Sequence, residues 1–166
     1  YIHWPYCIQK CPYCDFNSHV ARATVDPDDW ARAYIRELEF YRHLTGPRTV
    51  TSVFFGGGTP SLMDPKITAR VIEKINDLWG VSGVPEITLE ANPNSVEIEK
   101  FKSFKQNGIN RVSIGLQSLD DAQLKFLGRA HTAAEGIRAI QTAADMFDRY
   151  SFDLIYARPK QTLADW

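Results

Sequence analysis

The sequence predicts an α/β fold, specifically a partial, open, TIM-like (βα) barrel of about five strand–helix units. Three observations lead to this prediction. Five short apolar runs alternate with longer helical patterns, which implies a parallel sheet with right-handed crossovers. The later strands are apolar on one face and polar on the other, as in a barrel whose mouth holds a polar site. Five units are too few to close an eight-stranded barrel.

The predicted strands are short and several alternate in character. They span residues 1–4, 52–56, 86–92, 111–118 and 151–157. In the third strand Thr88, Glu90 and Asn92 share one face, opposite Ile87, Leu89 and Ala91. In the fourth, Arg111, Ser113, Gly115 and Gln117 oppose Val112, Ile114 and Leu116. A sheet covered by helices on both sides would be apolar on both faces.

The first two predicted helices open with the same pair of residues, Asp followed by Pro, which is an N-cap and a favoured first position. The first begins at Asp26-Pro27 and ends before Gly46, and the second begins at Asp64-Pro65 and ends before Gly80. Their expected buried stripes are Trp30, Tyr34, Leu38 and Tyr41 in the first, and Ile67, Val71, Ile75 and Leu78 in the second.

Three further helices are expected in the second half of the chain. One runs from about Ser95 to Asn107 and stops at Gly108, and a short one lies near 120–127. The last opens with the capping box Thr132-x-x-Glu135. The residues expected to point inward are Ile98, Phe101 and Phe104 in the first of these, and Ile137, Ile140, Ala144 and Phe147 in the last.

Length and composition suit one domain over residues 1–166. Hydrophobic residues make up 44% and charged residues 23% of the chain, with 19 Lys and Arg against 20 Asp and Glu. A nearly neutral charge predicts no nucleic-acid partner, and the short apolar runs predict no membrane span. A strand-like segment starts at residue 1 and residues 162–166 resemble an opening helical turn, so we expect a part of a longer protein.

The three cysteines of the chain, Cys7, Cys11 and Cys14, are spaced C-x3-C-x2-C. Thiolates are the usual ligands of iron–sulfur clusters, and three of them leave one iron of a [4Fe-4S] cluster open. That iron can bind a small molecule through amine and carboxylate groups. Clustered, unpaired cysteines also argue against a secreted disulfide scaffold, so we expect a cytoplasmic location.

A structural zinc site is the alternative for these cysteines. Cys11-x-x-Cys14 is half of a zinc knuckle, and Cys7 with His3 or His19 would complete a set of three thiolates and one imidazole. Structural zinc usually pairs two knuckles, and the sequence has no second pair, so the spacing favours the iron–sulfur cluster. Thiols without a ligand role are a third interpretation.

Other candidate residues lie where predicted strands end, and each has a plainer interpretation. Residues 55–60 (FGGGTP) follow the second strand, and their glycines allow backbone N–H groups to approach a ligand or simply form a tight turn. The remaining candidates are Glu90, Gln117, Arg129 and Asp153. These are ligand contacts if they face the barrel mouth, and otherwise a solvated carboxylate, a loop amide, a surface charge and a partnered strand residue.

The cysteine motif just after a first strand resembles the radical S-adenosylmethionine (SAM) superfamily. Residues 1–7 (YIHWPYC) and 11–19 (CPYCDFNSH) further resemble the oxygen-independent coproporphyrinogen III oxidase family, and within it the heme chaperone branch. The resemblance covers nearly the whole chain. It implies a radical SAM core that holds a [4Fe-4S] cluster on Cys7, Cys11 and Cys14.

The resemblance also implies a set of SAM contacts. These are Tyr1, Tyr13, Gly57, Gly58, Thr59, Glu90, Gln117, Arg129 and Asp153. The glycine-rich run would meet the amino group of SAM, Arg129 a carboxylate or ribose, and Asp153 a ribose hydroxyl. Tyr1 and Tyr13 would line the site or pack beside the loop, and His3 is expected to pack rather than ligate.

Two departures from the family pattern bear on function. The oxidases carry a fourth cysteine two residues after the third, where this chain has Phe16, which favours the chaperone branch. Residues 157–159 read Ala-Arg-Pro where the family usually has Gly-Leu-Pro, so Arg158 is expected to alter the barrel mouth.

The resemblance implies a protein that binds heme and transfers it to acceptor proteins, with SAM and an electron donor for the cluster as further partners. Reductive cleavage of SAM would yield methionine and a 5′-deoxyadenosyl radical. Radical decarboxylation of porphyrinogen propionates is the first alternative function, and a structural zinc module is the second.

Overall fold

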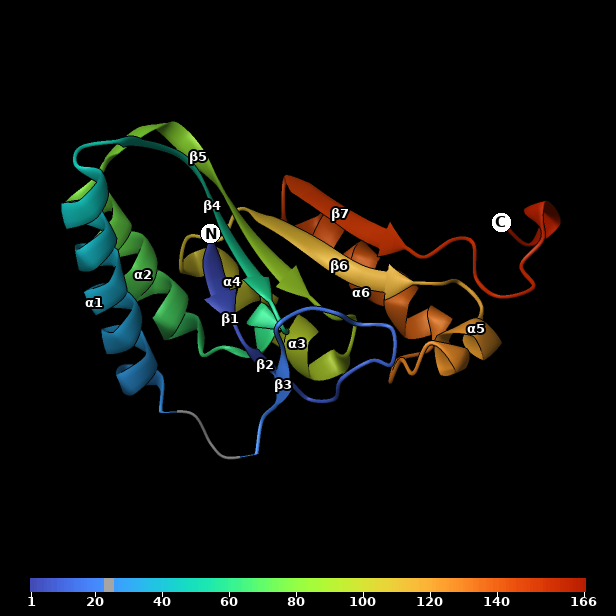
Figure 1. Ribbon diagram of the computed structural model, residues 1–166. Coiled ribbons are helices and arrows are strands. Elements are labelled where there is room, and N and C mark those ends of the chain that lie inside the picture. The colour runs from blue at the N-terminus through green and yellow to red at the C-terminus, as the bar shows by residue number, and fades with distance from the viewer. Residues whose placement is uncertain (23–25) are drawn as a thin grey trace.

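The computed structural model describes residues 1–22 and 26–166, with the backbone alone at 95 and 96. Five parallel strands form one sheet in the order β1-β4-β5-β6-β7 (Figure 1). The strands are β1 (Ile2–Trp4), β4 (Thr49–Gly57), β5 (Gly80–Ala91), β6 (Arg111–Gln117) and β7 (Arg149–Leu154). Their spatial order follows their sequence order without a reversal, which is the winding of a barrel rather than of a doubly wound sheet.

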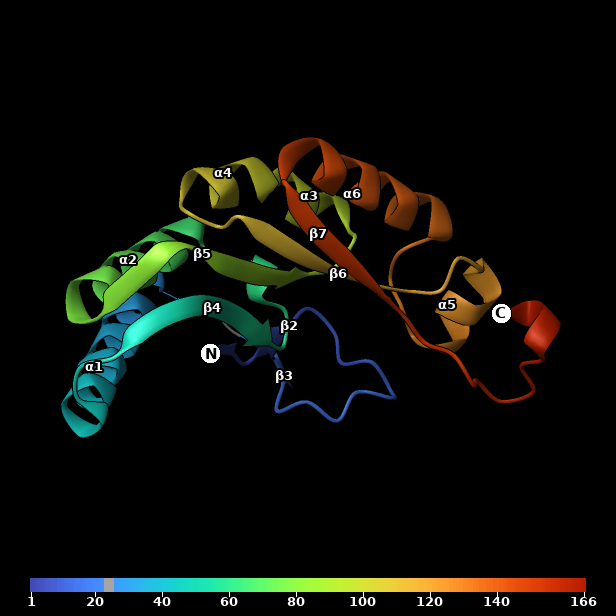
Figure 2. The same cartoon turned by 90° about the horizontal axis from the view of Figure 1, so that it is seen from above.

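Most of the helices lie along the convex side of this curved sheet, as Figure 2 shows. The helices are α1 (Pro27–Thr45), α2 (Pro65–Leu78), α3 (Ser95–Glu99), α4 (Phe101–Gln106), α5 (Asp121–Phe126) and α6 (Ala133–Met146), with 3₁₀ turns η1 (Pro60–Leu62) and η2 (Leu163–Asp165). α5 and the C-terminal turn η2 lie beyond the ends of β6 and β7 (Figure 2). The sheet does not close, so the prediction of an open, partial barrel is confirmed. No helix in the described ranges is long and apolar enough to span a bilayer.

The core lies between the sheet and the helices, and the predicted alternation of strand faces is confirmed. In β6 every second residue, Val112, Ile114 and Leu116, is fully buried, while the residues between them are partly exposed. Phe101 and Phe104 of α4 are also fully buried. The polar residues of β6 consequently lie on the concave side, where a site can form.

The predicted helix starts are confirmed by their caps. The side chain of Asp26 accepts hydrogen bonds from the N–H groups of Asp28 and Asp29, and Asp64 accepts from Lys66. Thr132 and Glu135 form the reciprocal capping box at the start of α6. Each cap satisfies N–H groups that the first helical turn leaves without partners.

Several details of the predicted elements need correction. The helix expected over 95–107 is two short helices with Lys100 between them. Two strands of two residues each, β2 (Tyr6–Cys7) and β3 (His19–Val20), were not predicted and form a separate parallel pair. Tyr41, expected on the buried stripe of α1, is 48% exposed.

The buried face of α6 is also different from the one expected. Ala139 and Ala143 are fully buried, whereas Ile137 is 45% exposed and Ala144 is exposed. The physical reason is a close approach of helix and sheet, because a Cβ added at Gly136 would overlap Leu116 Cδ1. Of the residues expected to point inward, Phe147 is buried and Ile140 packs against the core as predicted.

Candidate functional site

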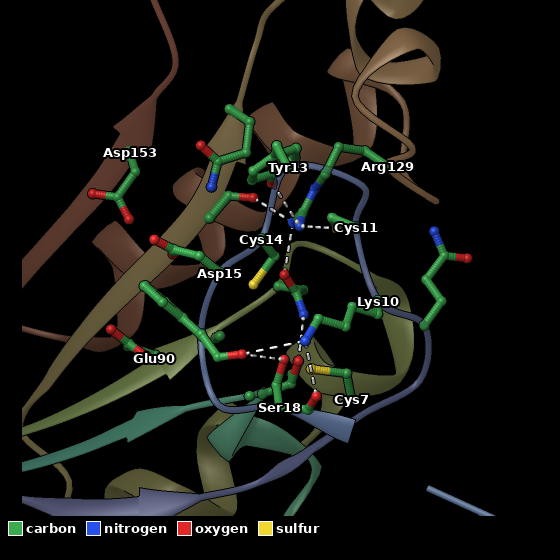
Figure 3. Close-up of a pocket in the computed structure, with 18 of the residues that line it drawn as sticks. Cys7, Lys10, Cys11, Tyr13, Cys14, Asp15, Ser18, Glu90, Arg129 and Asp153 are labelled. Carbon is green, nitrogen blue, oxygen red and sulfur yellow. Dashed lines mark hydrogen bonds between the residues drawn. The ribbon is translucent and has the colours of Figure 1, made fainter. Parts of the chain in front are cut away.

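A cavity of about 330 Å³ lies at the carboxyl ends of the strands, beneath the cysteine loop (Figure 3). All three cysteines line it, together with seven of the nine predicted SAM contacts. Those seven are Tyr13, Gly58, Thr59, Glu90, Gln117, Arg129 and Asp153. They come from segments more than 100 residues apart in the sequence, so the fold brings the predicted site together in one place.

The cysteine loop is closed by backbone hydrogen bonds. β2 pairs with β3, the N–H of His19 donates to the carbonyl of Pro5 (2.7 Å), and the N–H of Ala21 donates to that of Cys7 (3.1 Å). Inside the loop, Lys10 Nζ donates to the carbonyl oxygens of Phe16 (3.3 Å) and Ser18 (3.2 Å). Hydrogen bonds therefore close the two ends of the loop, and the ammonium group of Lys10 lies inside it.

The histidines considered for a zinc site do not line this cavity. His3 Nε2 donates to the carbonyl of Asn17 (2.9 Å), which leaves Nδ1 to accept from the hydroxyl of Tyr1 (3.3 Å). His19 is exposed in β3. Within residues 1–22 and 26–166, no group of three or more His, Cys, Asp or Glu side chains is arranged to hold a single metal ion.

The glycine-rich run binds other parts of the protein through its N–H groups. Gly57 donates to Glu90 Oε2 (3.1 Å), Gly58 to the carbonyl of Trp4 (2.6 Å) and Thr59 to that of Tyr6 (2.8 Å). These three N–H groups are thus engaged within the protein, and a contact between the glycine-rich run and SAM stays a prediction. The N–H groups hold the end of β4 against β1 and β2, and thus position the cysteine loop over the sheet.

Three carboxylates line the cavity: Glu90 of β5 and Asp153 of β7, on the two strands that flank β6, and Asp15 of the cysteine loop. Burial raises the pKa of Glu90, and the negative charge of Asp153 raises it further, while the hydrogen bond from Gly57 lowers it. Asp153 is exposed at the end of β7. Glu90 and Asp153 give the cavity floor an acidic character that suits an ammonium or hydroxyl group of a ligand.

Arg129 is, beside Lys10, the second cation that lines the cavity. Its Nη2 donates to Asn92 Oδ1 (2.6 Å) and to the carbonyl of Gly115 (2.7 Å), and its Nη1 donates to Cys11 Sγ (3.4 Å) and the hydroxyl of Tyr13 (3.5 Å). Figure 3 shows the guanidinium directed toward Cys11 and Tyr13. Burial raises the pKa of Tyr13 to about 12, against the opposing effect of Arg129.

Asn92 is a site residue that the sequence reasoning missed, although it was placed on the polar face of its strand. It lines the cavity, accepts from Arg129, and donates through Nδ2 to Thr59 Oγ1 (3.1 Å). Its own N–H donates to the fully buried carboxylate of Glu97 (2.8 Å). The only indication in the sequence was its alternation with Thr88 and Glu90.

Two predicted contacts lie apart from the others. Tyr1 is 74% exposed, stacks on Phe54 with ring centroids 6.2 Å apart, and lines a different groove. Gly57 contributes its bond to Glu90 but does not line the cavity. The roles of these two residues as direct SAM contacts remain predictions, and the geometry favours packing for Tyr1.

The segment that departs from the family pattern has a distinct backbone. Ala157 has a φ of 58°, in the left-handed region that glycine favours, and Arg158 Nη1 donates to the carbonyl of Ile155 (2.8 Å). Ile155 lines the cavity. Arg158 is therefore bonded to the backbone at the edge of the cavity mouth.

Comparisons with known proteins agree with this geometry. The sequence profile of the Radical SAM superfamily matches residues 1–166. The chain is 42% identical over 167 residues to the mitochondrial radical S-adenosyl methionine domain-containing protein 1 of Bos taurus, covering 100% of the chain and 38% of the relative. It is 39% identical over 166 residues to the heme chaperone HemW of Escherichia coli, covering 99% of the chain and 44% of the relative.

The fold also matches solved structures. The coproporphyrinogen III oxidase HemN of Escherichia coli superposes with a TM-score of 0.85 at 25% identity, over 99% of this chain and 38% of that one. The chain thus spans about two fifths of the length of these relatives. A profile match along the entire chain, together with relatives about 40% identical to it, places the chain in the radical SAM superfamily.

Proposed function

We propose that the cavity binds a [4Fe-4S] cluster through Cys7, Cys11 and Cys14, with SAM beside it. The observation that carries this proposal is the lining, because three thiols, three carboxylates, an ammonium group and a guanidinium meet in one space. Among the described residues, the Nε of Arg129 is also buried without a hydrogen-bond partner. Its N–H can therefore donate to a bound group. The donor set and the orphaned nitrogen both fit the proposed occupants.

Each residue has a role that its contacts support. Glu90 and Asp153 attract the ammonium group and the ribose hydroxyls of SAM. The N–H of Gly58 already donates to the carbonyl of Trp4, so the backbone near Gly58 offers SAM its carbonyl oxygens as further acceptors. Arg129 and Lys10 place positive charge beside the thiolates. When reduced, the cluster supplies the electron that cleaves a carbon–sulfur bond of SAM; the protein orients SAM and excludes water.

Anaerobic reconstitution tests the cluster. The full-length protein should take up iron and inorganic sulfide in equal amounts and no zinc, and SAM should perturb the electron paramagnetic resonance spectrum of the reduced cluster. Cys14→Ser should lose the cluster, whereas Ile8→Ser, an exposed position in the same loop, should keep it. Zinc without sulfide in the wild-type protein would contradict the proposal and support the zinc module.

We further propose that the whole protein is a heme chaperone. The relative named as a heme chaperone is 39% identical, whereas the oxidase is 25% identical. Phe16 also occupies the position of the oxidases' fourth cysteine. Acceptor proteins and an electron donor are the expected partners. A cytoplasmic location stays a prediction, since the bovine relative is named as mitochondrial.

Two assays on the full-length protein separate chaperone from oxidase. A chaperone should bind heme and pass it to an apoprotein acceptor, with little porphyrinogen turnover. An oxidase should decarboxylate coproporphyrinogen anaerobically with SAM and a reductant. Efficient decarboxylation without heme transfer would reverse the assignment and leave the cluster proposal intact.

A further inference from the structure

We propose that Asn92 is a positioning residue that holds the guanidinium of Arg129 against the sulfur of Cys11 and thereby raises the reduction potential of the bound cluster. This inference rests on the proposed function, because it concerns the same cavity. It goes beyond that function by giving a role to a residue outside the predicted ligand set.

The first step is the geometry of the guanidinium. Its Nη2 makes two short hydrogen bonds, to Asn92 Oδ1 (2.6 Å) and to the carbonyl of Gly115 (2.7 Å). A guanidinium is planar and rigid, so fixing one of its nitrogens fixes the direction of the others. The second nitrogen, Nη1, then lies 3.4 Å from Cys11 Sγ.

The second step is that Asn92 is itself held in place. Its Nδ2 donates to Thr59 Oγ1 (3.1 Å) and its backbone N–H donates to Glu97 Oε2 (2.8 Å). Glu97 is fully buried and also accepts from Ser61 and Asn94. A guanidinium can only donate, so the amide oxygen of Asn92 must face Arg129, and the amide nitrogen then donates to Thr59.

The third step is the effect on the cluster. Hydrogen bonds to the sulfurs are among the factors that set the potential of an iron–sulfur cluster. Reduction adds a negative charge, so a cationic N–H donor at a ligand sulfur stabilises the reduced state more than the oxidised one. Loosening Arg129 should therefore lower the potential, although Asn92 makes no hydrogen bond to a cysteine itself.

The test is a redox titration of the full-length, cluster-loaded protein, followed by electron paramagnetic resonance. Asn92→Ala should shift the one-electron reduction equilibrium about tenfold toward the oxidised cluster, which is about 59 mV. The matched control is Asn94→Ala. It removes the same kind of side chain, whose hydrogen bonds are to Glu97 and not to Arg129, so it should leave the potential unchanged.

A double-mutant cycle with Arg129→Lys shows whether Asn92 acts through the guanidinium. The two substitutions should be clearly non-additive in potential, because lysine offers no fork for Asn92 to hold. Additive shifts, or a wild-type potential in Asn92→Ala, would overturn the inference. If Asn92→Ala does not fold, Asn92→Leu, which is close in size and also lacks the accepting oxygen, enters the same cycle, and the same criterion decides.

Failure of this inference is distinct from failure of the proposed function. A wild-type protein that takes up no cluster overturns both. A wild-type protein that loads normally, beside an Asn92→Ala protein with the same potential and spectrum, overturns only the role of Asn92.

Discussion

Gly57 illustrates how one backbone position controls the contact between the cysteine loop and the sheet. Its φ is 117°, and an added Cβ would lie 2.6 Å from the ring of His3 and 2.7 Å from the carbonyl oxygen of Trp4. The position thus requires glycine for two reasons: its backbone conformation and the lack of space for a side chain beside β1.

Gly57→Ala should lower the free energy of unfolding by about 2–4 kcal/mol, from backbone strain and overpacking together. Chemical denaturation measures this loss. Gly46→Ala is the control, because Gly46 has a φ of 69° but nothing within 4 Å of the added Cβ. Its cost should be about 1 kcal/mol, from the left-handed backbone alone. Equal costs for the two variants would refute the packing argument.

His131 provides a prediction on pH. Its ring is buried, Nε2 donates to the carbonyl of Leu116 (3.1 Å), and burial together with Arg129 lowers its pKa below the ordinary 6.5. The unfolded chain therefore takes up a proton at a higher pH than the folded one. Stability should fall as the pH drops below 6.5, until the pKa of the folded state is reached.

His131→Gln should remove this contribution to the pH dependence. Urea denaturation at several pH values between 5 and 8 measures the slope for both proteins. The difference between them at pH 8 reports the altered hydrogen bond separately, because the ring is then neutral in both states. Parallel stability curves over the whole range would show that His131 does not titrate as proposed.

At the residue scale, the sequence predicted which side chains line the site better than it predicted what those side chains contact. Glu90 and Asp153 stood out as charged residues of predicted strands and Arg129 through the family resemblance, and all three line the cavity. Asn92 was missed as a site residue because it carries no charge and the resemblance assigned it no contact. Its importance comes from three hydrogen-bonding partners, Thr59, Glu97 and Arg129, which no local pattern reveals.

At the scale of elements, α6 shows the difference between an amphipathic pattern and an actual packing face. Phe147 and Ile140 pack against the core as expected, but Ile137 is exposed. The buried residues within the helix are Gly136, Ala139 and Ala143. A hydrophobic pattern does not predict how closely two elements approach each other. Where their backbones lie close together, only small residues fit between them.

Two adjacent alanines test this assignment. Ala143→Leu should destabilise the protein by about 1–3 kcal/mol, because the added atoms have no space against the sheet. Ala144→Leu adds the same atoms on the exposed side and should change stability by no more than about 0.5 kcal/mol. Thermal or chemical denaturation distinguishes them, and the reverse order would restore the face expected from the sequence.

The cysteine loop shows a second limit at this scale. β2 and β3 have two residues each, too few for any periodicity to be recognised. They exist because the glycine-rich run binds the carbonyls of Trp4 and Tyr6 and so holds the chain beside η1. Long elements with caps, such as α1 and α2, were placed within a residue or two of their observed bounds.

At the scale of the whole molecule, the open sheet has two outer strands, β1 and β7, in the part of the chain described. β7 pairs on one side with β6, and Tyr150 and Phe152 are 43% and 45% exposed. An uncovered strand edge with exposed aromatic residues favours association with other chains.

Segment 1–166 expressed alone should therefore associate in a concentration-dependent manner. Light scattering after size-exclusion chromatography measures its mass over a range of concentrations. Phe152→Lys should reduce the association, since charge on an edge strand opposes pairing. Lys160→Ala, in the loop beyond β7, is the control and should not reduce it. A monomer at all concentrations would show that the edge is harmless.

The sequence by itself determined the class of fold, the starts of the main helices and the identity of the cysteine ligands proposed for the cluster. These depend on local physics, namely strand alternation, helix caps and the reach of one short loop. The tertiary structure alone decided which face of α6 is buried, that the glycine-rich N–H groups serve the protein, and that Asn92 connects Thr59, Glu97 and Arg129. The reason is that these features depend on distances between segments far apart in the chain, and such distances exist only once the strands are side by side.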